Sequence, residues 1–251
     1  MKRWMIITVE TELDWPVEES TIPFMGHRLI LRPQDANSAA DIRLQYEHPQ
    51  SEREAIEIIC RFLSAFSWWQ RRPARGRLRF ACTAPMRGGK GGYGPALRKD
   101  YHLPDGVQSP SDSKARLAVA LYREAISVHS TPYEFLGYFK IINVRYNGPD
   151  QIISWINNAI PLLTDKRVKD RISELAASKA NLGEYLYGSG RCAVAHAFSG
   201  VVVDPDNPDD VLRLSADMPV ARTLAEHLIE TEFGIPWELS KRTEGSTVDS
   251  R

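Results

Sequence analysis

An arginine and a histidine five positions apart are the residues of this chain whose types could do chemistry together. Arg191 and His196 lie in the stretch YLYGSGRCAVAHAFSG, residues 185–200, with only small or apolar residues between them. A histidine can transfer protons near neutral pH, and an arginine can bind a phosphate group through two parallel hydrogen bonds. The two residues are therefore a candidate catalytic pair. The alternative is an ordinary helix start that contains both of them.

The spacing alone carries little weight, because the chain has 23 arginines and six histidines. A histidine five to seven positions after an arginine occurs four times, in Arg43 with His48, Arg123 with His129, Arg191 with His196, and Arg222 with His227. We expect Arg43 to be exposed on a strand and Arg123 to lie on the solvated side of a helix. Arg222 is expected to form a surface ion pair with Glu226, four residues further along a helix.

The setting of Arg191 distinguishes its pair from the other three. The run Gly188-Ser189-Gly190 predicts a break in the helix, and Ser189 can serve as the N-cap of a new helix that begins there. Arg191 would then lie in the first turn, where a cation opposes the helix dipole unless an anion binds there. The alternative is that His196 is a buried core histidine and that Arg191 covers an apolar rim.

The helical geometry sets a condition on catalysis by the pair. Five residues of a regular helix rotate by about 140°, so the two side chains do not lie on one face. They converge if Arg191 bends around the helix start, or if two subunits build the site together. A two-fold dimer interface satisfies the second condition, because it brings the same helix of each partner together.

Composition predicts an ordinary globular protein with neither a membrane span nor a metal site. The 251 residues are 43% hydrophobic and carry no net charge. No apolar run approaches the ~20 residues that a membrane-spanning helix needs. The N-terminal run MKRWMIITVETELDW resembles a first strand rather than a signal peptide, which predicts a cytoplasmic protein. The three cysteines and six histidines are scattered, so we expect no metal and no cofactor.

The positive charge is concentrated between Gln70 and Lys99, where nine basic residues occur without an acidic one. This segment contains Arg71, Arg72 and Lys90. A phosphate-binding loop is not predicted around Lys90, because Gly91 follows it and the spacing GxxxxGK is absent. The segment is either a surface that binds a polyanion or a solvated face followed by a mobile loop.

The first 110 residues are predicted to form an α+β domain that ends in a Gly/Pro-rich basic loop. The runs WMIITVE, HRLILR, DIRLQYE and RGRLRFACTA are typical of strands. The run SEREAIEIICRFLSAFSWW has the apolar spacing of a helix. The role of this domain is not predicted.

Residues 111–239 are predicted to form a helical domain, followed by a disordered tail over 240–251. A first helix is expected to begin at Ser113 and to bury Leu117, Ala120, Leu121 and Ala125. Further helices are expected from the runs PYEFLGYFKIINVRY, DQIISWINNAIPLL, DKRVKDRISELAASKANLGEYLY and SADMPVARTLAEHLIETEFG.

The run ALYREAISVHSTPYEFLGYFKIINVRY, followed by several helices and by YLYGSGRCAVAHA, resembles the HEPN superfamily of α-helical domains. It is most similar to the Apea-like branch and to methylamine utilisation protein J-like sequences, over roughly residues 113–232. The resemblance implies a dimeric helical bundle and a metal-independent endoribonuclease. Arg191 would contact phosphate and His196 would transfer protons, at a site composed from two protomers. Cys192 and Asn143 stand where the family often has a polar residue and a glutamate.

Two functions of different classes follow from the resemblance. The first is RNA cleavage by attack of the 2′-OH, which DNA lacks. In that case RNA would be held by Arg191, Arg71, Arg72 and Lys90, with Tyr187 and Cys192 as auxiliary residues. The second is a non-catalytic accessory protein of the methylamine-utilisation type, with a protein partner encoded in the same operon. Binding of a nucleotide at the helix start is a third possibility.

Overall fold

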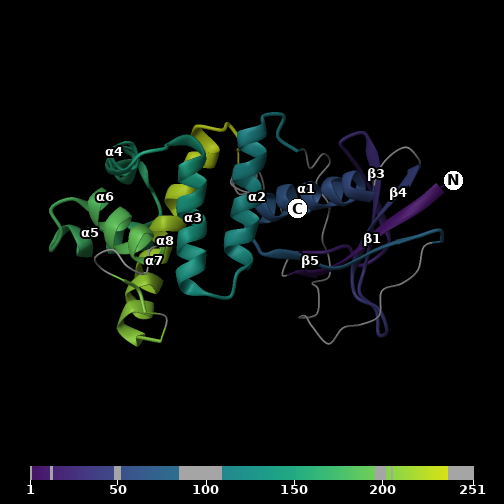
Figure 1. Ribbon diagram of the computed structural model, residues 1–251, viewed down its shortest axis with the longest axis horizontal. Helices are drawn as coiled ribbons and strands as arrows, with labels where there is room; N and C mark the ends of the chain where they lie inside the picture. The colour runs from purple at the N-terminus through teal and green to yellow at the C-terminus, as the bar shows by residue number, and fades with distance from the viewer. Residues whose placement is uncertain are drawn as a thin grey trace, which may run out of the picture. The chain divides into compact units, whose positions relative to one another are not determined.

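The computed structural model describes residues 2–11, 14–47, 52–84, 109–195, 202–204 and 206–236. The chain forms two compact units, and the described parts of these lie within residues 1–111 and within Asp112–Pro236. The first unit is an antiparallel sheet with a helix, and the second is helical (Figure 1). The predicted fold class, an α+β part followed by an all-α part, is confirmed.

The sheet of the first unit has five strands in the order β2 (Ser20–Phe24), β3 (His27–Arg32), β4 (Asp41–Glu47), β1 (Lys2–Thr11) and β5 (Ala74–Cys82). All neighbouring strands are antiparallel. Met25 and Gly26 join β2 to β3 with φ of 50° and 77°. A two-residue turn with two positive φ angles matches the twist of a hairpin, which explains the glycine.

Helix α1 (Glu52–Gln70) covers one face of this sheet. Alternate residues of the strands, such as Ile7, Ile42 and Leu44, meet its apolar side in a core that includes Phe62 and Phe66. The predicted helix and strands are confirmed here, because the apolar periods of 3.6 and 2 residues agree with the two elements that share the core.

The opposite face of the sheet corrects one prediction. Arg43 is not exposed but 4% accessible, and its Nε and Nη2 donate to the two oxygens of Asp41 at 2.6 and 3.0 Å. Ile6 and Thr8, which stand opposite these residues on β1, are buried as well. A charge in such surroundings needs a partner, and Asp41 supplies one on the same strand.

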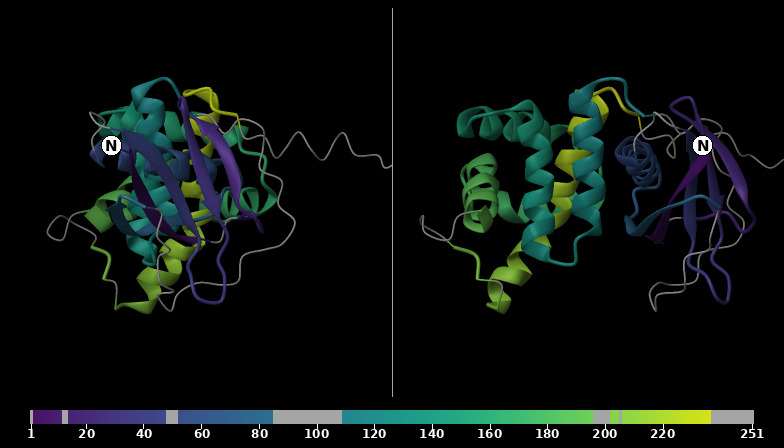
Figure 2. Two further views of the ribbon diagram at one scale, coloured as in Figure 1. Left: turned by 90° about the vertical axis from the view of Figure 1, so that its right-hand side faces the viewer. Right: turned by 45° about the vertical axis from the view of Figure 1, so that its right-hand side comes forward.

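Three long helices form the centre of the second unit: α2 (Ser113–Ser127), α3 (Thr131–Arg145) and α8 (Pro208–Thr231). They lie side by side in the views of Figure 2, and each contacts the other two. The α2 and α3 backbones approach closely, because a Cβ on Gly137 would lie 2.7 Å from the Cβ of Ala125. Phe135, Tyr138 and Leu224 are fully buried between the helices.

The start and the buried face of α2 differ from the prediction. Asp112, rather than Ser113, is the N-cap, and its carboxylate accepts from the amide of Ala115 at 2.8 Å. The buried stripe runs through Ala115, Ala118, Val119, Tyr122 and Ala125, whereas Leu117 is 50% exposed. The predicted stripe was rotated toward the large aliphatic residues. The close approach of Gly137 on α3 requires a small side chain at Ala125, and the large side chain that α2 buries is Tyr122 rather than a leucine.

The remaining elements are shorter than the sequence suggested. They are α4 (Pro149–Ala159), η1 (Ile160–Leu162), α5 (Lys166–Ala176), α6 (Leu182–Tyr185), η2 (Leu186–Cys192) and α7 (Ala193–Ala195). The predicted helix over 165–187 is interrupted after Ala176, and Asn181 caps a new helix. The last helix begins at Pro208, earlier than predicted, because Asn207 caps it and acidic residues of the connector fill its first turn.

Candidate functional site

The helix that carries Arg191 does not begin where the sequence predicted. Elements α6, η2 and α7 follow one another without a gap from Leu182 to Ala195, and η2 is a turn of π-helix. The N-cap is Asn181, whose side chain accepts from the amide of Glu184 at 3.1 Å. The expected break, with Ser189 as N-cap, is therefore wrong. Arg191 lies well inside the helix and gains nothing from free amides at a helix start.

The glycines of this turn have a packing role instead. A Cβ on Gly190 would lie 2.4 Å from Cε1 of Phe135, a fully buried residue of α3. Gly188, two positions earlier, is exposed, and a Cβ there would have no neighbour within 4 Å. Gly190 therefore lets the helix backbone approach α3, which a residue with a side chain would prevent.

The π-turn groups three of the predicted site residues. A π-helix pairs residue i with i+5, so Tyr187 lies next to both Arg191 and Cys192. The Arg191 guanidinium carbon is 5.5 Å from the centre of the Tyr187 ring, and Nη1 donates to Sγ of Cys192 at 3.8 Å. Burial raises the pKa of Tyr187, the charge of Arg191 opposes this shift, and Cys192 adds to it. All three side chains are half-buried.

The other predicted site residues are placed elsewhere or lie outside the described residues. His196 and Lys90 are outside them. Arg71 and Arg72 follow α1 in the first unit, where the Arg71 guanidinium carbon lies 5.2 Å from the centre of the Trp68 ring. Arg72 Nη1 donates to Oδ1 of Asp14 at 3.0 Å. Both arginines thus take part in the contacts that close the end of α1.

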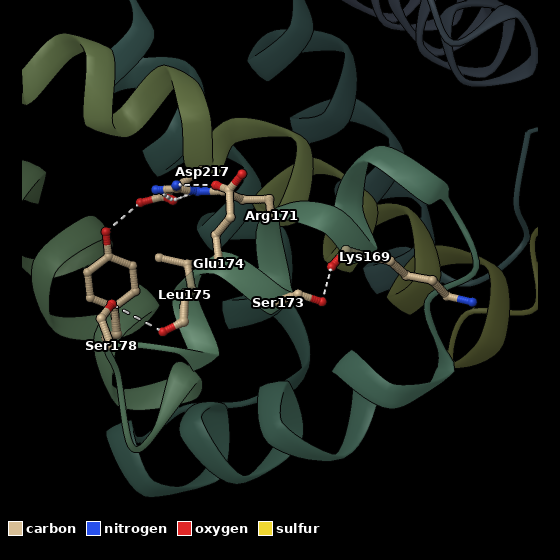
Figure 3. A network of polar contacts seen from close by, with 8 residues as sticks. Lys169, Arg171, Ser173, Glu174, Leu175, Ser178 and Asp217 are labelled. Carbon is tan, nitrogen blue, oxygen red and sulfur yellow. Dashed lines mark hydrogen bonds and ion pairs between the residues drawn. The ribbon is translucent and has the colours of Figure 1, made fainter.

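A buried carboxylate beside the π-turn was missed by the sequence analysis. Asp217 of α8 is 1% exposed, and its Oδ1 accepts from Nε and Nη2 of Arg171 at 2.9 and 2.8 Å (Figure 3). Its Oδ2 accepts from the hydroxyl of Tyr185 at 2.8 Å. The available signal was an aspartate three residues after Leu214 and four before Ala221, within an otherwise apolar stripe.

These contacts alter the acid–base properties of both partners of Asp217. Burial lowers the pKa of Arg171, but hydrogen bonds to Asp217 and Glu174 outweigh it, so the net pKa is raised. Burial and the hydrogen bond to Asp217 raise the pKa of Tyr185. The arginine therefore stays charged and the tyrosine neutral, which is the combination that two donors to one carboxylate require.

A second polar cluster connects the three long helices. Glu226 accepts from the Tyr122 hydroxyl at 2.6 Å and from Nε of Arg222 at 2.9 Å. Tyr138 donates to Glu134 at 3.0 Å, and the charge of Arg222 acts on both of these residues. The predicted Arg222–Glu226 pair is confirmed, but it is not a surface pair, since Glu226 is 7% exposed.

Two properties of the described residues bear on the class of site. In that part of the chain, His, Cys, Asp and Glu side chains form no group that could hold a metal ion. None of the described helices is both long and apolar enough to cross a membrane.

Comparison with known proteins finds one family. Residues 118–230, from the middle of α2 almost to the end of α8, match the family described as methylamine utilization protein MauJ. The match includes Tyr187, Arg191, Cys192 and His196 and confirms the predicted similarity to methylamine utilisation protein J over this part of the chain. No curated protein and no solved structure matches.

Proposed function

We propose that the helical unit is an HEPN-type, metal-independent endoribonuclease that acts as a cytoplasmic homodimer. Arg191 contacts the scissile phosphate and His196 transfers protons. RNA supplies its own nucleophile, the 2′-OH, so the site needs only a proton-transferring group and a cation for the charge that develops on the phosphate. The observation that carries the proposal is the position of the Arg191 guanidinium, over the ring of Tyr187 and half-buried at the π-turn.

This placement suits a phosphate contact for two reasons. A guanidinium held against an aromatic ring loses less conformational freedom when it binds a ligand, and its planar N–H groups match phosphate oxygens. A half-buried position also weakens the screening by water, which strengthens the attraction to an anion. Tyr187 is then a residue that supports Arg191. Cys192, which accepts from the same guanidinium, occupies the position of the polar residue common in the HEPN superfamily.

The test measures cleavage of single-stranded RNA by the full chain in the presence of EDTA. We expect His196→Ala to slow cleavage at least about 100-fold, the usual contribution of a general acid or base, without loss of the fold or of the dimer. Arg191→Ala should reduce both RNA binding and cleavage. His129→Ala is the matched control, because His129 follows Arg123 at a similar spacing and is exposed just after α2.

Two results would contradict the proposal. One is cleavage that His196→Ala leaves unchanged. The other is equal cleavage of an oligonucleotide whose 2′-OH groups are replaced by hydrogen, because the proposed nucleophile is then absent.

The proposal includes Arg71, Arg72 and Lys90 as contacts to the RNA backbone. Asp14 already neutralises much of the charge of Arg72, so we expect this arginine to contribute less than Arg191. Replacement of Arg72 by alanine should weaken RNA binding equally for all sequences and reduce its salt dependence. An unchanged salt dependence would remove Arg72 from the proposed RNA surface.

A second candidate is favoured by the family match, whose description refers to methylamine utilization. In this reading the helical unit is a non-catalytic accessory protein, and Arg191 binds a carboxylate of a protein partner. The partner proposed is an amine-oxidising enzyme encoded in the same operon. Tight binding to the purified enzyme that Arg191→Ala weakens, together with no RNA cleavage by the wild type, would favour this candidate over the first.

A further inference from the structure

The π-turn changes the donor of one backbone carbonyl. In a regular α-helix the amide of Ala193 would donate to the carbonyl of Ser189, four residues earlier. Here that amide donates to the carbonyls of Gly188 and Gly190 instead, on either side of Ser189. The α-helical hydrogen bond of the Ser189 carbonyl is therefore given up within the turn.

A side chain of α8 donates to this carbonyl. Arg213 Nη1 lies 2.8 Å from the oxygen of Ser189, and Nη2 lies 3.4 Å from Oδ1 of Asp210 one turn earlier. Arg213 is half-buried, with a side-chain exposure of 25%. A hydrogen bond from a charged donor is stronger than one from a neutral amide, particularly where water is partly excluded. The contact therefore favours the register in which Ala193 leaves the Ser189 carbonyl to Arg213.

The residue before the turn is fixed from the same side. Asp217 lies one helical turn after Arg213 on α8 and accepts from the hydroxyl of Tyr185, the last residue of α6. Arg171 holds the Asp217 carboxylate from α5. Two successive turns of α8 therefore hold the helix just before the π-turn, at Tyr185, and in the middle of the π-turn, at Ser189.

The register decides which side chains meet at the candidate site. In the π-turn, Tyr187 contacts both Arg191 and Cys192. In an α-helix, a residue and its fifth successor are rotated by about 140° and separated by about 7.5 Å along the axis. Arg191 would stay near Tyr187 in that register, but the Cys192 side chain would move away from Tyr187.

We propose that Arg213 is a positioning residue that keeps residues 186–192 in the π register and thereby holds Arg191 and Cys192 together beside Tyr187. Its importance for RNA cleavage rests on the proposed function, whereas its effect on the register does not.

The first test is hydrogen exchange of the full chain. Arg213→Met removes the donor and keeps much of the aliphatic volume. We expect the amides of residues 186–195 to exchange at least about tenfold faster than in the wild type, because the variant loses a hydrogen bond from a charged donor. Arg145→Met is the matched control, because it removes an arginine contact to Glu232 just after the other end of α8. The control should leave exchange in this segment unchanged.

The second test measures directly whether residues 186–192 are in the π register. In a Tyr187→Cys variant, mild oxidation can join positions 187 and 192 in the π register, but not in the α register, where five residues exceed the ~7 Å that a disulfide can span. We expect the yield of this bridge, measured by mass spectrometry of the peptide, to fall at least about fivefold when Arg213→Met is added. Arg213→Lys, which keeps a charged donor, should restore most of it.

Unchanged exchange and unchanged bridge formation in Arg213→Met would overturn the inference. Should this variant not fold, Arg213→Leu, which also lacks a donor, is measured in its place with the same expectation. A wild-type chain that cleaves no RNA, but whose exchange and bridge respond as described, would refute the proposed function and support the role of Arg213.

Discussion

The two halves of α8 each carry a buried carboxylate that accepts from an arginine and a tyrosine, but the arginines come from different places. Asp217 is paired with Arg171 of α5, 46 residues away in the sequence. Glu226 is paired with Arg222 of its own helix, one turn earlier. The first ion pair joins two helices, whereas the second joins neighbouring positions of one helix.

The two carboxylates also differ in how much apolar packing surrounds them. Helix α5 buries only Val168 and Leu175, so apolar packing alone holds it weakly on α8. Glu226 lies among fully buried residues such as Leu224 and Leu228, in the centre of the three-helix core. A buried ion pair therefore matters most where little apolar surface supports the same contact.

Loss of the Asp217 carboxylate should have the largest effect. Asp217→Asn removes the negative charge that Arg171 pairs with and leaves one acceptor oxygen for two donors, Arg171 and Tyr185. We expect the free energy of unfolding to fall by about 3 kcal/mol. Glu174→Gln is the control, because Glu174 contacts the same arginine but is 66% exposed, so its effect should stay within about 0.5 kcal/mol. Urea unfolding measures both. Equal losses would show that Asp217 has no special role.

The contact between the Gly190 backbone and Phe135 should be nearly as sensitive to substitution as Asp217. Gly190→Ala places a methyl group against Phe135, and we expect a loss of about 2 kcal/mol from overpacking. Gly188→Ala meets open space and should be neutral or stabilise by up to about 1 kcal/mol, since alanine favours a helix. Thermal unfolding of the two variants gives the comparison, which similar melting temperatures would contradict.

The Glu226 half should tolerate loss of charge better. Glu226→Gln keeps an acceptor for Tyr122 and leaves Arg222, whose side chain is 37% exposed, able to reach water. We expect a loss of about 1 kcal/mol in urea unfolding, below that of Asp217→Asn. A larger loss than for Asp217→Asn would reverse the comparison between the two halves.

The smallest effect is expected at Glu134 and has the opposite sign. Burial raises the pKa of Glu134 above its ordinary value of 4.5, against the hydrogen bond from Tyr138 and the charge of Arg222. The folded state therefore binds more protons than the unfolded chain, and stability falls as pH rises from 4.5 through the raised pKa.

Glu134→Gln removes this titration. It should be slightly more stable than the wild type at pH 8, and this advantage should disappear as the pH falls below 4.5. Urea unfolding across this pH range measures it, with the exposed Glu184→Gln as control. A stability difference independent of pH would contradict the assignment to Glu134.

Much of the fold was predictable from local patterns. Strands β3 and β4 and helix α1 followed from apolar periods, because each buries one face against a single core. Errors arose where packing overrides such patterns. Large aliphatic residues suggested the wrong stripe on α2, and the surroundings that bury Arg43 and Glu226 come from other elements, which local sequence does not reveal.

The sequence by itself determined the order of the two units, the similarity to methylamine utilisation protein J and the identity of Tyr187, Arg191 and Cys192 as residues of interest. Only the tertiary structure decided how these three meet. A Gly-Ser-Gly run predicts a helix break when the residues that pack against it are unknown. Here Phe135 requires the glycine at position 190, and Arg213 satisfies the carbonyl at position 189. Contacts from α3 and α8 thus keep the helix continuous as a π-turn, because they supply the space and the donor that local sequence cannot.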